Sequence, residues 1–352
     1  MSYQNGWAAL HLEMTDKIPR TEYSASEHWE LVSRVTGIAV TSLSPPQLQA
    51  RASEAFRRAW DYGYDWRILT HNQIFDGKYT RMGHAVYASD GADFSNETME
   101  LFDDPEDALR LDPFQLYGAR DPAALTAEFN RDYHSAADQK PDYVPMTGIY
   151  VTLMSGLLEI LGWDMLLTCA GVDPKGFGAL TNRYGNWIQQ YFDALAKSDA
   201  PVVMVHDDIV WTSGPFVHPE FYRSFLFPNY KKLFAPLAEQ GKVILYTSDG
   251  NYTQFVDDIA ACGVSGFVLE PCTDMRMIAE KYGKTHSFTG NFDTRVLLSG
   301  TREDIDREMR RCMEIGRKYP GFFLAVGNHI PANTPVENAL YYNDLYERYS
   351  RR

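Results

Sequence analysis

The second half of the chain alternates short apolar runs with segments of helical periodicity. Each run is apolar along its length and does not alternate with polar residues, which is typical of strands buried on both faces of a parallel sheet. We therefore predict five strands here. The predicted strands are Val202–His206, Val243–Thr247, Gly266–Glu270, His286–Gly290 and Phe322–Val326.

A segment with helical spacing follows each of these runs. Pro228 and Pro236 interrupt the first segment and predict a kink. Asn251 is a candidate cap for the second, and Gly283 ends the third. Five consecutive strand–helix units predict a parallel sheet with right-handed crossovers, either a (β/α)8 barrel or a doubly wound sheet. The predicted helices are Pro219–Gln240, Tyr252–Ala261, Asp274–Tyr282, Arg302–Lys318 and Val336–Tyr349.

The first half of the chain is less regular. We predict strands at Trp66–Thr70, Ala85–Ala88 and Tyr143–Thr147. Candidate helices are Ser26–Val35, Pro46–Tyr62 and Pro122–Ala137. No Pro-, Gly- or Ser-rich linker and no internal repeat separates the halves, so we interpret residues 1–352 as a single α/β domain, with an N-terminal helical elaboration over residues 1–62.

Composition narrows the function classes. The chain has 352 residues, of which 45% are hydrophobic and 23% charged, as in ordinary globular proteins. Its 33 basic and 47 acidic residues give a net charge of -14, which would repel nucleic-acid phosphates and anionic membrane surfaces on average. We therefore expect neither a nucleic acid nor a membrane as partner. A local basic pocket for a small anionic substrate remains compatible with this balance.

The cysteine pattern and the apolar windows point to the cytoplasm. The four cysteines include no C-x-x-C pair, and scattered cysteines in a long chain fit a reducing compartment. Glu13 and Asp16 interrupt any leader-like N-terminus. The most apolar window, Thr147–Gly171, carries Glu159 and Asp164, so we expect a buried segment there and not a membrane span.

Polar residues gather directly after the predicted strands of the second half. Ligands of parallel α/β proteins bind beyond the carboxyl ends of the strands, so these residues are the candidates for chemistry. Like charges in such a pocket demand a metal, a cationic substrate, or a carboxylic acid that stays protonated. The segments are His206-Asp207-Asp208, Ser248-Asp249-Gly250-Asn251, Glu270-Pro271-Cys272, Asn291-Phe292-Asp293 and Gly327-Asn328-His329-Ile330-Pro331.

Each of these groups also has a purely structural interpretation. Asp207 or Asp208 could cap a helix, and His206 or His329 could be a hydrogen-bonded core residue. The Asp249 and Asn291 segments could be turns and caps. Aromatic residues that could line a pocket, but are more often core, are Trp66, Tyr87, Trp211 and Phe216. The joint occurrence of polar groups at successive strand ends favours function more than any single residue does.

At these strand ends the chain resembles the uroporphyrinogen decarboxylase superfamily, from about Tyr143 to the C-terminus. The superfamily contains the decarboxylase of haem synthesis and zinc methyltransferases that move methyl groups between corrinoid proteins, coenzyme M and methylated substrates. The resemblance implies a (β/α)8 barrel with its site at the C-terminal mouth. Besides the strand ends, it rests on Gly214-Pro215, Asp274, Lys281-Tyr282-Gly283, Gly290-Asn291-Phe292-Asp293-Thr294 and Thr334-Pro335-Val336-Glu337-Asn338.

Both branches of the superfamily differ from this chain at their ligands. The decarboxylase has an Arg-Gln-Ala-Gly-Arg type segment, whose nearest counterpart here is Ile18–Tyr23 with one arginine, so haem-pathway decarboxylation is disfavoured. The methyltransferases hold zinc through His-x-Cys and a later Cys, where this chain has Thr247-Ser248-Asp249 and Asn328. Without thiolates, a thiol acceptor is disfavoured, although nitrogen and oxygen ligands could still hold zinc.

The resemblance leads us to expect a methyltransferase that moves a methyl group from a small, for example methoxylated, substrate to a corrinoid carried by a partner protein. The expected zinc ligands are His206, Asp249, Glu270 and His329. The expected catalytic residues are Asp207, Asp208 and Asp249, and the expected substrate contacts are Arg20, Glu22, Tyr23, Asn291 and Asn328.

Two alternatives stay open. One is a metal-free carboxy-lyase, in which Arg20 or Arg81 would hold a substrate carboxylate. The other is a non-catalytic protein that binds a small molecule on this fold. Barrels of this superfamily are often dimers, so a homodimer is also expected.

Overall fold

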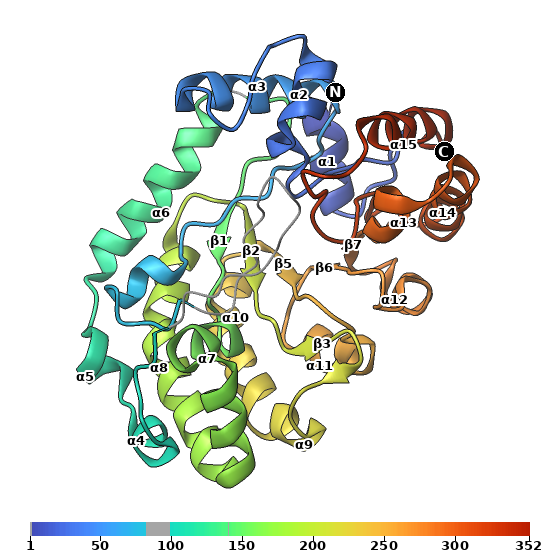
Figure 1. Ribbon diagram of the computed structural model, residues 1–352. Helices are drawn as coiled ribbons and strands as arrows, with labels where there is room; N and C mark the ends of the chain where they lie inside the picture. The colour runs from blue at the N-terminus through green and yellow to red at the C-terminus, as the bar shows by residue number, and fades with distance from the viewer. Residues whose placement is uncertain (1, 82–98, 140) are drawn as a thin grey trace.

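Six parallel strands form the central sheet of the computed structural model, which describes residues 2–81, 99–139 and 141–352 (Figure 1). Their order in the sheet is β1-β2-β5-β6-β7-β8, which is also their order along the chain. Every later strand therefore pairs beside its predecessor, as in a sheet that curls in one direction. The strands are β1 (Thr147–Ile149), β2 (Val202–His206), β5 (Val243–Thr247), β6 (Gly266–Val268), β7 (Ser287–Thr289) and β8 (Phe322–Phe323).

Isolated parallel bridges carry the sheet from β8 back to β1. Arg20 bridges both Leu324, just after β8, and Tyr62. Tyr64 in turn bridges Val144, just before β1. The segments around Arg20 and Tyr64 therefore supply the two remaining strand positions of the barrel, and the prediction of a (β/α)8 barrel is confirmed. Because Arg20 belongs to the ring, the predicted N-terminal elaboration over residues 1–62 is partly barrel.

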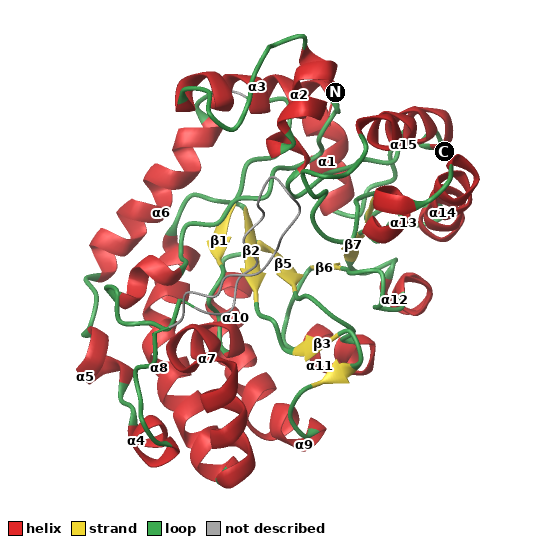
Figure 2. Cartoon of the chain, viewed as in Figure 1, coloured by secondary structure: helices red, strands yellow, loops and turns green. Residues whose placement is uncertain are grey.

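The helices lie around the outside of the strands (Figure 2). The predicted helices at 122–137 and 336–349 have the expected bounds. The helices are α1 (Ser2–Leu10), α2 (Trp29–Thr36), α3 (Pro46–Ala59), α4 (Pro105–Arg110), α5 (Pro113–Tyr117), α6 (Pro122–Ala137), α7 (Met154–Val172), α8 (Pro174–Lys197), α9 (Pro219–Phe221), α10 (Phe227–Glu239), α11 (Val256–Ala260), α12 (Met275–Tyr282), α13 (Thr294–Ser299), α14 (Arg302–Gly316) and α15 (Val336–Tyr349).

Several predictions of local structure need correction. The segment Trp66–Thr70 is not a regular strand, since within it only Thr70 forms a bridge, to Ile149. The predicted strand Ala85–Ala88 lies outside the described residues. The helix predicted over 219–240 begins with α9, passes through one π-helical segment at Tyr222–Leu226 and continues as α10. This interruption precedes Pro228, as expected where a proline removes a backbone donor.

Helix α7 is the one described helix long and apolar enough to cross a membrane by length and composition. Its most apolar window is 56% buried inside the protein, and Gly162 breaks the helix with a φ of 71°. Glu159, on this helix, is 1% exposed. A core helix passes the same test of length and composition, and the extent of burial agrees with the buried segment predicted from the sequence.

The core has two parts because alternate residues of each strand face opposite sides. Val203 and Val205 of β2 pack in the large cluster between the strands and the helices. Val202 and Met204 belong to a smaller cluster with Leu245, Phe323 and the end of α1. This smaller cluster fills one end of the barrel and leaves side chains of the other end free to form a cavity.

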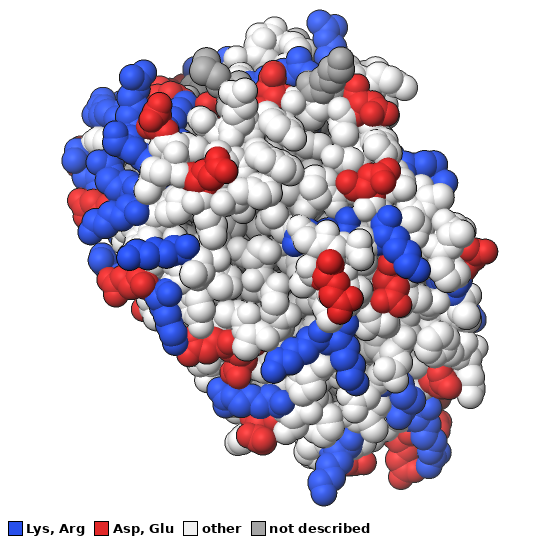
Figure 3. All heavy atoms as spheres, turned by 180° about the vertical axis from the view of Figure 1, so that it is seen from behind, with Lys and Arg blue, Asp and Glu red and all other residues white. Residues whose placement is uncertain are grey.

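Charged side chains do not form a single-sign patch on the face seen in Figure 3. Basic and acidic side chains are interspersed there around a largely uncharged centre.

Candidate active site

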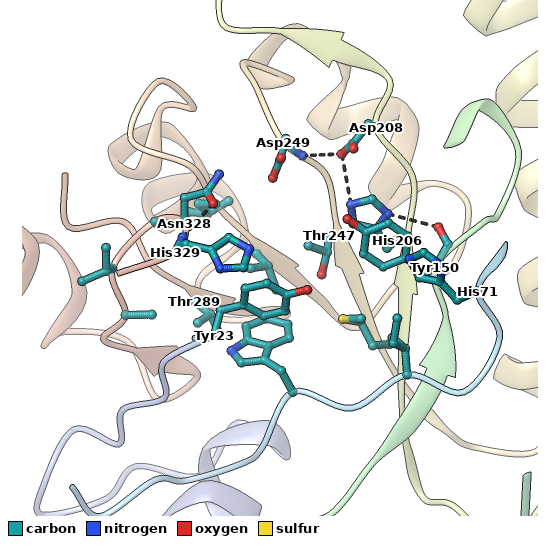
Figure 4. A pocket seen from close by; sticks show the side chains of 18 residues that line it. Tyr23, His71, Tyr150, His206, Asp208, Thr247, Asp249, Thr289, Asn328 and His329 are labelled. Carbon is teal, nitrogen blue, oxygen red and sulfur yellow. Dashed lines mark hydrogen bonds and ion pairs between the residues drawn. The ribbon is translucent and has the colours of Figure 1, made fainter. Parts of the chain in front are cut away.

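A cavity of about 210 Å³ lies at the carboxyl ends of the strands (Figure 4). Its walls come from β2, β5, β6, β7 and the segments after β1 and β8, which is where a barrel of this kind places its site. Apolar side chains make part of the lining and polar ones the rest. The lining residues are Tyr23, Trp66, Ile68, His71, Tyr150, Met204, His206, Asp208, Thr247, Asp249, Val268, Leu269, Thr289, Ala325, Val326, Gly327, Asn328 and His329.

Asp208 joins the two polar strand ends of β2 and β5. Its Oδ1 lies 3.1 Å from His206 Nε2 and accepts a 2.9 Å hydrogen bond from the backbone N–H of Asp249. Its own backbone N–H donates to Ser155 Oγ at 2.8 Å. The carboxylate of Asp208 is therefore held between a cationic partner and the turn that carries Asp249.

His206 is positioned through both ring nitrogens. Nδ1 donates to the carbonyl of Tyr150 at 3.1 Å, and the Tyr150 ring stacks on the imidazole with centroids 3.7 Å apart. Burial alone would lower the pKa of His206, but the charge and hydrogen bond of Asp208 outweigh it and raise the pKa to about 9. Because each nitrogen faces an acceptor, the geometry also favours the imidazolium.

Asp249 lines the cavity and is exposed, unlike its buried neighbours Ser248 and Gly250 (Figure 4). Burial and the neighbouring charges of Asp208 and Glu270 raise its pKa well above the ordinary value, although His206 and a hydrogen bond from Asn328 act in the opposite direction. Two adjacent carboxylates do not both ionise easily in such a place. Asp249 is therefore suited to hold a proton, while Asp208 pairs with His206.

Gly250 fixes the direction in which Asp249 points. It has a φ of 80°, which favours glycine, and a Cβ at this position would lie 2.5 Å from the carbonyl oxygen of Val210. Its N–H donates to Glu270 Oε2 at 2.7 Å. The Asp-Gly pair that predicted a turn is thus a close approach between two strand-end loops.

An aromatic wall faces the acidic group across the cavity. The Tyr23 and His329 rings meet edge to face at 4.3 Å, and Tyr23 meets Trp66 at 6.1 Å. Burial lowers the pKa of His329 to about 3, so it is neutral. Burial, with the charges of Asp249, Glu27 and Asp208, raises the pKa of Tyr23 to about 12.

The four predicted zinc ligands do not form one metal site in this structure. His206 uses both nitrogens and is cationic, so it lacks a lone pair for a metal. Glu270 binds the backbone of Gly250 and the side chain of Asn328. Within the described ranges, no three His, Cys, Asp or Glu side chains gather in a way that could hold a metal ion. The described residues therefore show no preformed zinc site, and zinc remains a prediction from the sequence.

Asp207, predicted to be catalytic, does not line the cavity. Side chains alternate along the end of β2, so Asp207 points away from the mouth that His206 and Asp208 face. Its carboxylate accepts from the backbone N–H groups of Leu153, Met154 and Ser155 at 2.7–3.1 Å, and from Tyr230 Oη at 2.5 Å. It holds the beginning of α7, which is the structural alternative the sequence left open.

Arg20 and Glu22, predicted to contact substrate, are also behind the barrel wall. They form an ion pair at 3.1 Å, and both side chains are fully buried. Arg20 lies over the Trp60 ring at 4.2 Å, and Tyr342 Oη donates to Glu22 at 2.7 Å. This pair connects the first strand position of the barrel to α15, and a substrate cannot reach it.

Asn291 is likewise a structural residue. Its side chain donates to the carbonyls of Glu270 and Thr273, each at 3.1 Å, and accepts from Arg311 at 2.9 Å. It is 1% exposed and does not line the cavity. Of the predicted substrate contacts, Tyr23 and Asn328 do line it.

Some lining residues were missed in the sequence. Tyr150 and His71 follow β1 and the bridging residue Thr70, so the strand-end rule would have found them with correct strand bounds. Met204, Thr247 and Thr289 lie inside strands and gave no signal. Trp66 does line the cavity, whereas Trp211 and Phe216 pack against Trp163. Tyr87 lies outside the described residues.

Comparison with known proteins agrees with this architecture. A family model described as uroporphyrinogen decarboxylase (URO-D) matches residues 111–349. The uroporphyrinogen decarboxylase of Syntrophotalea carbinolica is 26% identical over 175 residues, which cover 50% of this chain and 49% of that protein. The one of Carboxydothermus hydrogenoformans is 25% identical over 205 residues, 57% of each chain. The matches thus span about half the length of these curated relatives.

A solved structure extends the likeness to the whole chain. A methyltransferase from Methanosarcina mazei superposes with a TM-score of 0.63 over 99% of this chain and 98% of its own, at 17% identity, and so shows the same fold. The family model covers more than half of the chain, including every strand of the central sheet. The chain therefore belongs to the uroporphyrinogen decarboxylase (URO-D) family.

Proposed function

We propose that this protein is an enzyme that transfers a methyl group from an oxygen of a small methylated substrate to a corrinoid carried by a partner protein. The observation that supports this proposal is the placement of Asp249. Its carboxyl group faces the cavity, and its raised pKa favours the protonated form beside the fixed His206–Asp208 pair. A proton donor at this place is what a poor oxygen leaving group needs.

In this mechanism Asp249 acts as a general acid. The substrate oxygen lies within hydrogen-bond reach of the Asp249 carboxyl group. The bond between methyl carbon and oxygen breaks with its electron pair on oxygen, which takes the proton of Asp249. The methyl carbon forms its new bond with an electron pair of the acceptor. Solvent then returns a proton to Asp249.

The other polar groups keep Asp249 in the useful state. Asp208 pairs with His206, and its negative charge opposes ionisation of Asp249. Asn328 bonds the Asp249 side chain and orients it. His206, Asp208 and Asn328 are positioning residues, because they act through Asp249 and not on the substrate.

A carboxy-lyase is less favoured by the lining. No Lys or Arg is among the described residues that line the cavity, so a substrate carboxylate at the reacting end would face Asp208 and Asp249. Arg20 is sealed behind the wall. Arg81, the other candidate, is an exposed residue outside the lining.

The experiment uses free cob(I)alamin as the methyl acceptor and 3-methoxybenzyl alcohol as the methyl donor. The change in visible absorbance of the cobalamin on methylation reports the rate. We expect turnover by the wild type and a loss of roughly 100-fold or more in Asp249→Asn, the usual range for removal of a general acid. Asp257→Asn is the matched control, because Asp257 is an exposed carboxylate on α11 paired with Lys281. The rate should fall as pH rises through the raised pKa of Asp249.

Unchanged activity in Asp249→Asn would overturn this mechanism. Release of CO2 from 3-methoxybenzoate, without methylation of cobalamin, would favour the lyase instead. Zinc remains a prediction from the sequence, which elemental analysis of the protein purified without chelators tests. A cytoplasmic location, in line with four free cysteines, and a homodimer belong to the same proposal.

A further inference from the structure

A second chamber of about 210 Å³ adjoins the main cavity on the far side of the aromatic wall. The two spaces have lining residues in common and are therefore direct neighbours. The chamber also has residues of its own, which are Ser24, Glu27, Arg57 and Arg67. The shared residues are Tyr23, Trp66, Ile68, Met204 and His329.

Two arginines in this chamber are held from behind and keep donors free. Arg57 Nε lies 2.8 Å from Asp65, and Arg67 Nη2 lies 2.7 Å from Asp132. Neither Asp65 nor Asp132 lines the chamber. Among the described residues, both terminal amino groups of Arg57 and the Nη1 of Arg67 have no hydrogen-bond partner.

The charges of the two spaces are opposite in character. The chamber is lined by two guanidinium groups against one carboxylate, that of Glu27. The main cavity holds Asp208 and Asp249, and no Lys or Arg among its described lining residues. An arginine presents its donors in a planar fork that suits carboxylates and other oxyanions.

We propose that the chamber binds an anionic group, a carboxylate or a similar oxyanion, of the same substrate whose methylated oxygen faces Asp249. This inference rests on the proposed function and names the substrate class for it. The body of the molecule lies along Tyr23 and Trp66, whose rings line both spaces and suit a flat or apolar spacer. The anion is thereby held away from Asp208 and Asp249.

Binding of two matched probes tests the chamber without turnover. Titration calorimetry compares 3-methoxybenzoate with 3-methoxybenzyl alcohol, which differ in the anionic group. We expect the benzoate to bind more tightly to the wild type, and Arg67→Gln to weaken the benzoate about ten-fold while the alcohol is unaffected. Arg57→Gln should behave alike. Arg58→Gln is the control, because Arg58 is on the same helix, pairs with Glu54 and does not line the chamber.

Equal affinity of the two probes in the wild type would refute the anion site, as would an Arg67→Gln variant that leaves benzoate binding unchanged. Arg57→Gln leaves Asp65 without its partner, so the melting temperature of this variant is measured first. If the variant is unfolded, the binding measurements on Arg67→Gln decide between the outcomes, because Arg67 is more exposed. Failure of the proposed function looks different, since the benzoate would then bind through the arginines while no methyl transfer occurs from either probe.

Discussion

The pairing of His206 with Asp208 makes a quantitative prediction about pH and stability. The pKa of His206 is raised from 6.5 to about 9, and its side chain is 4% exposed, so solvent screens the interaction little. A shift of this size corresponds to about 3 kcal/mol of folding free energy, at 1.36 kcal/mol for each pH unit. Because the pKa is raised on folding, this contribution is complete below pH 6.5 and is lost as pH rises through about 9.

The perturbation is Asp208→Asn, which removes the anion and leaves the imidazole buried. Burial then lowers the pKa of His206, so the deficit in stability of the variant is largest below pH 6.5 and shrinks as pH rises to about 9. Urea unfolding at several pH values gives the difference in free energy from the wild type, and Asp257→Asn serves as control. Protonation of Asp249 also contributes folding free energy that is lost as pH rises, since its pKa is raised as well.

Imidazole NMR separates the two groups. Carbon-13 labelling of the histidine rings follows His206 directly, and His206→Gln assigns its signal. We expect a titration near pH 9 in the wild type that moves well below it in Asp208→Asn. A His206 that titrates at or below 6.5 in the wild type would refute the imidazolium, and with it the argument that Asp208 is ionised and Asp249 protonated.

Two further predictions concern residues that the structure assigns to the scaffold. Asp207→Ala should lower the free energy of unfolding by roughly 3 kcal/mol, because buried N–H groups at the beginning of α7 and Tyr230 Oη lose their acceptor. Urea unfolding measures this change, and an unchanged stability would contradict the role. Glu22→Gln should lower the free energy of unfolding by roughly 3–5 kcal/mol, because Arg20 then keeps a fully buried charge without its counterion. The affinity for 3-methoxybenzyl alcohol, measured at a temperature where the variant is folded, should not change. A specific loss of binding would place the Arg20–Glu22 pair in the active site.

Much of the barrel was predictable because its strands carry a strong local signal. A strand buried on both faces is mostly apolar, and the runs Val202–His206 and Val243–Thr247 show this most clearly. The first strand position of the barrel gives no such signal, since Arg20 and Glu22 are charged and still fully buried. Their mutual pairing makes this burial possible together with Asn343, which accepts from Arg20, and Tyr342, which donates to Glu22, and these two partners lie more than 300 residues away in the chain.

The sequence by itself determined the order of strands and helices and the set of polar strand ends, because both depend on short-range patterns of burial and turn formation. Only the tertiary structure decided which of those polar groups share the cavity. Asp207 and Asp208 are neighbours in the chain, yet one caps α7 and the other binds His206, because successive side chains at a strand end point to opposite sides. The arginine chamber beside the cavity is equally a product of tertiary packing, since Arg57, Arg67 and His329 come together only when the ring of strands closes.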